Sequence, residues 1–494
     1  MLFLMFLIVW VGLEIITNRF EGTPTYPIDS YFYLSKAEQL AGGNGLVTNW
    51  NDGFDRKYFP GYSLLLAATS RMKNSVILLQ SAAYLACGVL LGYMMLLFNF
   101  ERPLAFLAMT ALWGNPISLK WFSLPMAEGA ALTLCLISAV LFFASRGYLG
   151  FFLACAVGGL AVITRMEAVF LLPVFGGYLF FEKRERMKWP IVATGTALFM
   201  APLVAYWLWV RSAIGESPAY VKEFLHTLRG TRLLENLAYN IWVPFAFMHR
   251  PDRLVAGHGL ISTPGFAAIV WFAVGEFVFL IGLVWAVSGK LNKQARVAAW
   301  LFLAYAFLHS FWYYRYERFM MMALPMAVIV WAAAVAKLGS LLKKPGNSWL
   351  VVLAQVMIAT SGLYLGNHYS KLHIEELRAD TEWLQFQDIA RIVNRRNTTH
   401  SPVLADLGPH LAYYLDAHTY LDTAHGNYWQ RAFPAERTVE EMERLGIELV
   451  VTRKDIDQWL EEHRVPLSAR DRFKLAEILP NGVTLLEFRR ARSR

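Results

Sequence analysis

Apolar stretches of about 20 residues recur along most of this chain, and each is long enough for a helix to cross a bilayer. Hydrophobic residues make up 56% of the 494 residues, a share that soluble globular chains rarely reach. We therefore predict a polytopic α-helical membrane protein. Its eleven predicted spans cover residues 1–18, 75–98, 104–119, 124–145, 149–164, 166–181, 190–210, 264–287, 297–312, 319–338 and 349–366.

The basic residues indicate how these spans are oriented. The formal net charge is +9, but the Lys and Arg residues lie mostly in short loops between apolar stretches, so membrane topology explains them better than nucleic-acid binding does. With a cytoplasmic N-terminus, the inside loops include the basic segments 182–188, 289–296 and 337–348. This arrangement follows the positive-inside rule and predicts a multi-pass membrane protein. The membrane that we expect is a bacterial inner membrane, although the outside compartment could be a periplasm, a cell exterior or an organelle lumen.

Three larger pieces then lie on the extracytoplasmic side. Two are the loops 19–74 and 211–263, the second with two expected interfacial helices. The third is the tail, where short strand-like and helix-like segments alternate. The predicted domains are a transmembrane module, 1–366, and a small soluble α/β domain, 367–494. The expected strands are SPVLADLG, HTYLDT, GIELVVTRKD and VTLLEFRR, and the expected helices are TVEEMERL and DIDQWLEEH.

Several polar residues gather at the outer ends of the predicted spans. Each alone has an ordinary explanation, because loop charges are solvated and Arg or Tyr residues at span ends anchor the interface. Together they combine an acid with several cations and aromatic rings at one membrane depth. This combination suits a site where a carboxylate takes a proton from a hydroxyl and cations stabilise a phosphate. The candidates are Asp29, Lys57, Tyr58, Glu128, Arg165, Arg315, Tyr316 and Arg318.

One further acid, Glu276, lies in the middle of the predicted span 264–287. A charged side chain is costly at that depth, so an acid there is a functional candidate by default. No basic residue is close to it in the sequence. We expect this carboxyl to be protonated or paired within the bundle.

Several short motifs follow one another in a definite order along the predicted spans. A first span is followed by a loop with an early acid, Asp29, and by Lys-x-x-Pro-x-x-x-Leu-Leu-Leu-Ala, which starts at Lys57. Further on come Glu128 after a proline, Gly-Leu-Ala-x-x-Thr-Arg-x-Glu over 159–167, and the Arg-Tyr pair at 315–316. The order of these features resembles the GT-C superfamily of integral-membrane glycosyltransferases, in the branch of protein O-mannosyltransferases and the lipid A aminoarabinose transferase. The similarity covers about residues 1–330 well and the tail loosely.

This resemblance implies a sugar donor linked to a polyprenyl phosphate, and an active site at the outer membrane face. It implies that Asp29 is the general base, that Lys57 contacts the donor phosphate, and that Arg315 or Arg318 is a second phosphate contact. We expect Tyr58, Glu128, Arg165 and Tyr316 to contact substrate. An acceptor hydroxyl would attack the anomeric carbon opposite the phosphate, so the configuration there would invert.

Some alternatives stay open at this point. The chemistry requires no metal if Lys57 and an arginine carry the phosphate charge, although Asp29 with Asp52 or Asp55 is a possible carboxylate set for a divalent metal. A flippase for lipid-linked sugars would also need cations, but neither a base nor a sizeable outside domain. A membrane scaffold would need none of these residues. The sequence does not choose between a lipid, a glycan and a protein acceptor.

Overall fold

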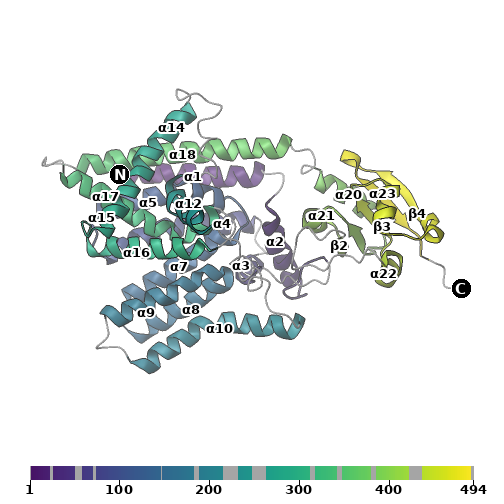
Figure 1. Cartoon of the computed structure of the whole chain (residues 1–494), viewed down its shortest axis with the longest axis horizontal. Coiled ribbons are helices and arrows are strands. Elements are labelled where there is room, and N and C mark those ends of the chain that lie inside the picture. The colour runs from purple at the N-terminus through teal and green to yellow at the C-terminus, as the bar shows by residue number, and fades with distance from the viewer. Residues whose placement is uncertain are drawn as a thin grey trace. The chain divides into compact units, whose positions relative to one another are not determined.

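The chain divides into two compact units, which we describe separately. The first unit comprises Met1–Gly22 and Met72–Leu372, and the second comprises Thr23–Arg71 and His373–Arg494. The loop that follows the first span therefore belongs to the same unit as the C-terminal tail. The computed structural model (Figure 1) describes residues 2–22, 26–50, 58–69, 74–145, 147–182, 188–214, 232–246, 263–311, 317–341, 348–379, 385–421 and 437–490.

The first unit is a bundle of helices, and every predicted span contains one. Within the described residues, six helical segments are long and apolar enough to cross a membrane: Phe3–Phe20, Ser75–Leu97, Ala127–Ala144, Trp189–Ser212, Gly265–Val287 and Glu317–Leu341. The helices that run uninterrupted are α1 (Leu2–Gly22), α4 (Ser75–Leu97), α7 (Ala127–Ala144), α8 (Tyr148–Thr164), α10 (Trp189–Ile214), α16 (Lys293–His309) and α18 (Ser348–Ala379).

Other spans change their helical form along their length. The 3-10 turn η1 (Met166–Phe170) precedes α9 (Leu171–Glu182), and the 3-10 turn η4 (Glu317–Ala323) precedes α17 (Leu324–Leu341). The span around Glu276 consists of α14 (Thr263–Trp271), the π-helical turn η3 (Phe272–Phe277) and α15 (Val278–Val287). The described part of the predicted loop 211–263 contains α12 (Leu233–Ala246), and the second expected helix there lies outside the described residues.

The predicted span 104–119 is divided between α5 (Arg102–Trp113) and α6 (Pro116–Phe122). The side chain of Asn115 caps α6 by accepting a 2.8 Å hydrogen bond from the amide of Ile117, and Pro116 occupies the first helical position. Both features favour a new helix start. A hydropathy profile indicates one span here because the apolar character of the sequence continues across the break between α5 and α6.

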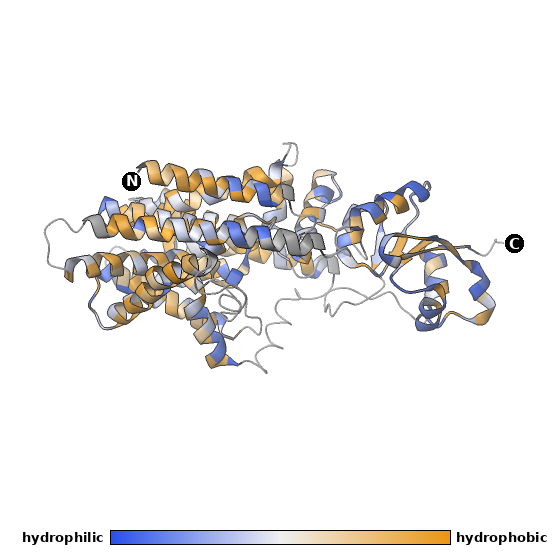
Figure 2. Ribbon diagram, turned by 90° about the horizontal axis from the view of Figure 1, so that it is seen from above, coloured by the Kyte–Doolittle hydropathy of each residue, from blue (hydrophilic) through white to orange (hydrophobic). Residues whose placement is uncertain are grey.

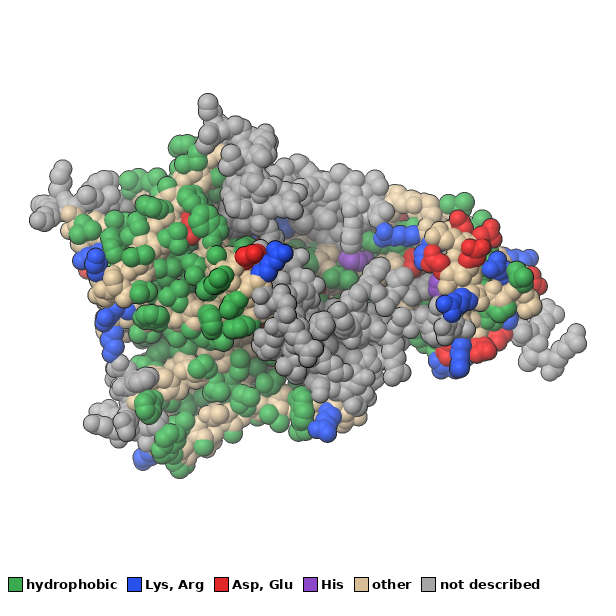
Figure 3. Space-filling view, viewed as in Figure 1, with side chains coloured by type: hydrophobic (Ala, Val, Ile, Leu, Met, Phe, Trp, Pro, Cys, Tyr) green, Lys and Arg blue, Asp and Glu red, His purple; other side chains and the backbone are tan. Residues whose placement is uncertain are grey.

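The bundle exposes apolar side chains, as a membrane protein does to lipid. Figure 2 shows its helices mostly in the hydrophobic colour, and hydrophobic side chains dominate its visible surface in Figure 3. Large apolar residues such as Phe3, Trp10, Leu149, Val284 and Trp300 are more than half exposed. In water such a surface would be strongly unfavourable, whereas lipid tails solvate it.

The interior of the bundle relies on close helix contacts. Helix α7 packs against α8 and α4, while α17 packs against α15, α16 and α5. Two glycines allow particularly close approach, since a Cβ at Gly12 would collide with the Tyr84 ring and one at Gly362 would collide with the backbone of Gly114. Small residues at helix interfaces are typical of membrane bundles, where close packing replaces the hydrophobic effect.

The soluble part of the second unit is a three-layer α/β domain. The part of the domain that the structure describes has five strands, ordered β2-β1-β3-β5-β4, with β1 parallel to β2 and β3, and the remaining pairs antiparallel. The four predicted strands are confirmed, whereas β4 was not predicted. The strands are β1 (Val403–Ala405), β2 (Thr419–Leu421), β3 (Leu449–Thr452), β4 (Phe473–Ile478) and β5 (Thr484–Phe488).

Helices cover both faces of this sheet. On one face, α20 (Phe386–Arg396) and α21 (Gly408–Tyr414) pack on Val403 and Ala405; on the other, α22 (Thr438–Leu445) and α23 (Ile456–Glu462) pack on Leu404. Alternate residues of a strand face opposite sides, so β1 contributes to both cores. Both predicted helices, α22 and α23, are confirmed, while α20 and α21 were not predicted.

Candidate active site

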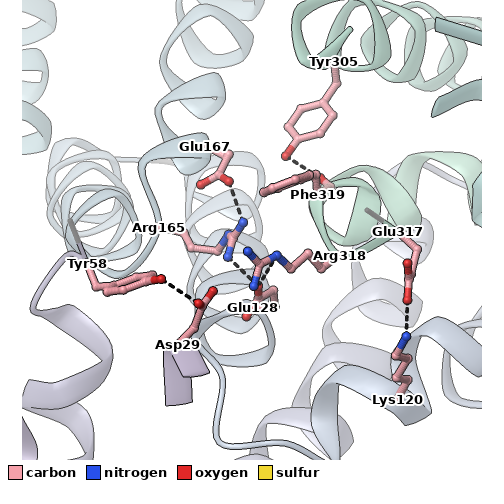
Figure 4. A network of polar contacts seen from close by, with 10 residues as sticks. All are labelled: Asp29, Tyr58, Lys120, Glu128, Arg165, Glu167, Tyr305, Glu317, Arg318 and Phe319. Carbon is pink, nitrogen blue, oxygen red and sulfur yellow. Dashed lines mark hydrogen bonds and ion pairs between the residues drawn. The ribbon is translucent and has the colours of Figure 1, made fainter. Parts of the chain in front are cut away.

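A network of four charged side chains occupies one end of the bundle (Figure 4). The Arg165 guanidinium donates to Glu128 Oε1 at 2.5 Å and to Glu167 Oε1 at 2.6 Å. The Nε of Arg318 lies 3.9 Å from the same Glu128 oxygen. Two arginines therefore face two glutamates, and their formal charges balance.

Breaks between helices bring this network together. Arg165 has extended backbone angles between α8 and η1, and Glu128 lies in the first turn of α7. Because α7 packs closely against α8, the start of one helix meets the end of the other. A carboxylate in the first helical turn interacts favourably with the helix dipole, which offsets part of the cost of burying Glu128 completely.

The two arginines differ in exposure, and this difference separates their roles. The Arg165 side chain is 7% exposed and lies between two carboxylates, whereas Arg318 is 21% exposed and contacts Glu128 at a longer distance. Removal of a buried arginine with two carboxylate partners would leave their charges uncompensated, so Arg165 has a structural role. The more accessible Arg318 has the better position to meet an anionic ligand.

A second ion pair involves the residue next to Arg318 in η4. Lys120, at the end of α6, donates to the buried Glu317 of η4. The ring of Trp121 has both Lys120 Nζ and Arg318 within cation–π distance, at 5.2 Å and 6.0 Å from its centroid. Lys120 is 42% exposed. The two cations, Lys120 and Arg318, thus share one aromatic ring.

The backbone of η4 is held in place by Tyr305 of α16, whose hydroxyl donates to the carbonyl of Phe319 at 3.0 Å. The Phe319 ring lies 5.2 Å from the Arg318 guanidinium and 5.7 Å from that of Arg165. This support fixes the turn that carries Arg318.

The predicted base lies in the second unit, in the first turn of α2 (Ile28–Ala41). Asp29 is 8% exposed, and its Oδ1 accepts a 2.6 Å hydrogen bond from the hydroxyl of Tyr58 (Figure 4). The Nζ of Lys36 donates to the Tyr58 carbonyl at 2.7 Å, which ties the turn before α3 (Gly61–Thr69) to α2. The loop thereby orients one carboxylate through an aromatic hydroxyl.

Solved structures share this architecture, although no family model and no curated protein matches the chain. ArnT from Cupriavidus metallidurans bound to undecaprenyl phosphate is similar with a TM-score of 0.63 and 13% identity, over 97% of each chain. Its apo state gives 0.62 and 14% over the same shares. The Archaeoglobus fulgidus oligosaccharyltransferase, in complex with Zn and sulfate, gives 0.55 and 12%, over 97% of this chain and 72% of its own.

The chain has the GT-C fold. This confirms the fold that the sequence resemblance implied, including a polytopic helical module with a C-terminal sheet. At a sequence identity of 12–14%, the structural similarity establishes the fold alone. The roles of individual residues therefore have to be argued from this chain's own contacts.

Within the described part of the GT-C fold, the predicted site residues form two sets. Asp29 lies with Tyr58, and Glu128, Arg165 and Arg318 lie together. Lys57, Arg315 and Tyr316 lie outside the described residues, as do Asp52 and Asp55 of the alternative metal set. Among the described residues, no three His, Cys, Asp or Glu side chains form a group that could hold a metal ion.

Two lysines were missed by the sequence analysis. Lys36 and Lys120 each stand in an otherwise aromatic or apolar stretch, YFYLSKA and PISLKWF. A lone cation in such a stretch is the available signal, because burying its stem without a polar partner for its ammonium group is unfavourable. Their actual partners come from distant parts of the chain and leave no local pattern.

Glu276 lies apart from the charged network, in the π-helical turn η3. It is fully buried, and no side chain of the described residues donates a hydrogen bond to its carboxyl oxygens. The π-turn opens the helical ladder, and Trp331 Nε1 donates to the carbonyl of Val274 there at 2.6 Å. No ion pair joins this carboxyl to a cation in the described residues, and a charged side chain is costly at such a position.

Proposed function

We propose that this chain is a GT-C glycosyltransferase that moves a sugar from a polyprenyl-phosphate donor to an acceptor hydroxyl. The observation that carries the proposal is the orientation of a buried carboxylate, Asp29, by the Tyr58 hydroxyl within a GT-C fold. One similar protein, ArnT, has been solved bound to undecaprenyl phosphate, which supports a lipid phosphate as the donor's leaving group here.

In the proposed reaction, the acceptor oxygen attacks the anomeric carbon of the sugar. The bond from that carbon to the phosphate oxygen breaks, and polyprenyl phosphate leaves with the bonding electrons. The acceptor's proton passes to the Asp29 carboxylate, with Tyr58 holding the carboxylate in orientation. Attack opposite the leaving group inverts the anomeric centre.

The departing phosphate needs fixed positive charge, since it develops in a partly dry site. We assign this task to Arg318, with Lys57 and Arg315 as the further cations predicted from sequence. Glu128 and Arg165 act through position in this proposal, because their mutual ion pair is buried and fixes the network against which Arg318 lies. The remaining predicted substrate contacts are Tyr58 and Tyr316.

The proposal includes a location. The basic loops favour a multi-pass protein of a bacterial inner membrane whose reaction takes place on the extracytoplasmic side. A lipid-linked donor would then enter the site from the bilayer. The acceptor would be a lipid, a glycan or a protein exposed on that side.

The direct test is incubation of the purified protein with a panel of radiolabelled polyprenyl-phosphate sugars and candidate acceptors. Release of free polyprenyl phosphate together with a labelled acceptor supports the transferase. The alternative, a flippase of lipid-linked sugars, predicts an intact donor that changes leaflet in proteoliposomes. Movement without cleavage would therefore contradict the proposed function.

A further inference from the structure

The helix that carries Asp29 is bound tightly to the soluble α/β domain. Tyr31, two residues after Asp29 and fully buried, packs its ring against three rings of α21. The centroid distances are 4.9 Å to His410, 5.4 Å to Tyr413 and 6.0 Å to Tyr414. Edge-on and tilted arrangements of this kind are favourable aromatic contacts, and they contribute beyond the area they bury.

Hydrogen bonds surround this aromatic contact. The Tyr413 hydroxyl donates to Glu38 Oε1 of α2 at 2.6 Å. The side-chain amide of Asn49 donates to the carbonyls of Leu415 at 3.2 Å and Ala417 at 3.3 Å. The first loop is therefore joined to the domain both along α2 and at Asn49.

The same loop also covers the edge of the domain's sheet. Strand β2 is an edge strand, and Trp50 forms a parallel bridge with its Thr419, whose amide donates to the Asn49 carbonyl at 3.1 Å. An uncovered edge would leave backbone groups open to unwanted pairing. The backbone of the loop at Asn49 and Trp50 pairs with this edge at Thr419.

A chain of ring contacts leads from that edge back to the carboxylate. Trp50, 1% exposed, packs edge-on against Phe32 at 5.2 Å, and Phe32 lies 5.1 Å from Tyr58. Tyr58 in turn donates to Asp29. The sheet edge and the carboxylate are thus joined by three successive contacts between closely packed side chains.

We propose that the C-terminal domain is a positioning element for the Asp29 helix, with Tyr31 and Trp50 as its two anchoring residues. This inference rests on the proposed function in one respect, the assignment of Asp29 as base. The domain contacts α2 through Tyr31. It also supports Tyr58, the hydrogen-bond donor to Asp29, through the ring contacts of Trp50 and Phe32. Loosening either attachment misorients the carboxylate without removing any group that touches substrate.

The test compares variants of the full-length protein that remove the hydrogen bonds around the aromatic contact and keep the rings of Tyr31 and Trp50. Asn49→Ala removes two hydrogen bonds to the domain, and Tyr413→Phe removes the bond to Glu38 while keeping the ring. Matched controls are Asn397→Ala and Tyr420→Phe in β2. The Asn397 side chain forms hydrogen bonds within its own turn, with the backbone of Ser401 and the hydroxyl of Thr399. In the described structure, no hydrogen bond or ring contact joins either control side chain to the first loop.

Two readouts are measured on each variant: hydrogen–deuterium exchange of the amides in 28–41, and transfer kinetics at saturating donor and acceptor. In the Asn49→Ala/Tyr413→Phe double variant we expect exchange in α2 to rise roughly tenfold or more, because hydrogen bonds between the first loop and the domain are lost. We expect kcat to fall by a similar factor, roughly tenfold, with an unchanged KM for the donor. Exchange in β1 and β3 and the behaviour of both controls should stay as in the parent.

Unchanged exchange in α2 would overturn the inference, as would faster exchange in α2 with an unchanged kcat. An effect of the same size in the controls would also overturn it, because general loosening of the domain would then be the cause. If the parent protein transfers no sugar at all, the proposed function fails. The exchange comparison still decides in that case whether the domain holds α2.

Discussion

The hydroxyl of Tyr58 donates a 2.6 Å hydrogen bond to Oδ1 of Asp29, although 29 positions separate the two residues in the chain. Asp29 alone in a helix's first turn is explained by the helix dipole. A second side chain that fixes the orientation of its carboxylate is what a general base requires, since proton transfer depends strongly on geometry. The pair is therefore the centre of the proposed mechanism.

Removal of this hydrogen bond gives the first prediction. Tyr58→Phe keeps the ring among Phe32 and Tyr33 but removes the hydroxyl that donates to Asp29. We expect kcat to fall roughly tenfold or more, the effect of losing a hydrogen bond to a charged group, with little change in the donor's KM. Steady-state kinetics of purified protein measure this, and Tyr93→Phe on the surface of α4 is the control. A kcat equal to that of the control would remove Tyr58 from the mechanism.

The second prediction separates the two arginines of the network. Arg318→Ala should weaken donor binding about tenfold or more, because a charge-assisted contact to phosphate is lost, while the melting temperature stays near that of the parent. Titration with polyprenyl phosphate measures the affinity. Arg211→Ala, on the exposed end of α10, is the control for loss of a surface arginine.

Arg165→Met provides the contrasting variant. It leaves the fully buried Glu128 without its closest cation, and breaking a buried ion pair in this way costs about 3–5 kcal/mol. The variant should therefore melt at a clearly lower temperature. If Arg318→Ala destabilised the protein and Arg165→Met weakened only donor binding, the two assignments would have to be exchanged.

Sequence reasoning predicted the fold well because apolar length and the alternation of strands and helices are local properties. It missed β4 because FKLAEI offers little alternation, and it treated 104–119 as one span because the Asn115 cap interrupts the helix without interrupting hydropathy. The site was recoverable only as a set of candidates. Arg165 and Glu128 are 37 positions apart, and no local pattern encodes such a pairing.

The third prediction concerns Glu276 in the π-helical turn. If the carboxyl is carried as a neutral acid, Glu276→Gln should preserve the melting temperature, since the amide has the same shape and no charge. Glu276→Lys should lower it strongly, because an ammonium group would replace a neutral side chain in an apolar interior. Thermal unfolding in detergent compares the two. Equal, large destabilisation by both variants would indicate that the native carboxylate is ionised and paired.

Membrane topology gives the fourth prediction. The basic segment 182–188 should be cytoplasmic, and the C-terminal domain should be extracytoplasmic. A cysteine introduced at Lys474, an exposed position of β4, should react with an impermeant maleimide on cells whose outer membrane alone is permeabilised, whereas a cysteine at Met187 should react only after lysis. Labelling of the Met187 position before lysis would overturn the orientation.

The central claim is that Asp29 takes the proton of the acceptor hydroxyl, and Asp29→Asn tests it most directly. Asn has nearly the same shape and remains a good residue for a helix start, but it does not accept that proton. The account predicts that turnover at saturating donor and acceptor falls by about a hundred-fold to ten-thousand-fold, while donor affinity and melting temperature stay near those of the parent. Near-normal turnover in the folded variant would contradict the catalytic role of Asp29 and favour the lipid-translocating alternative.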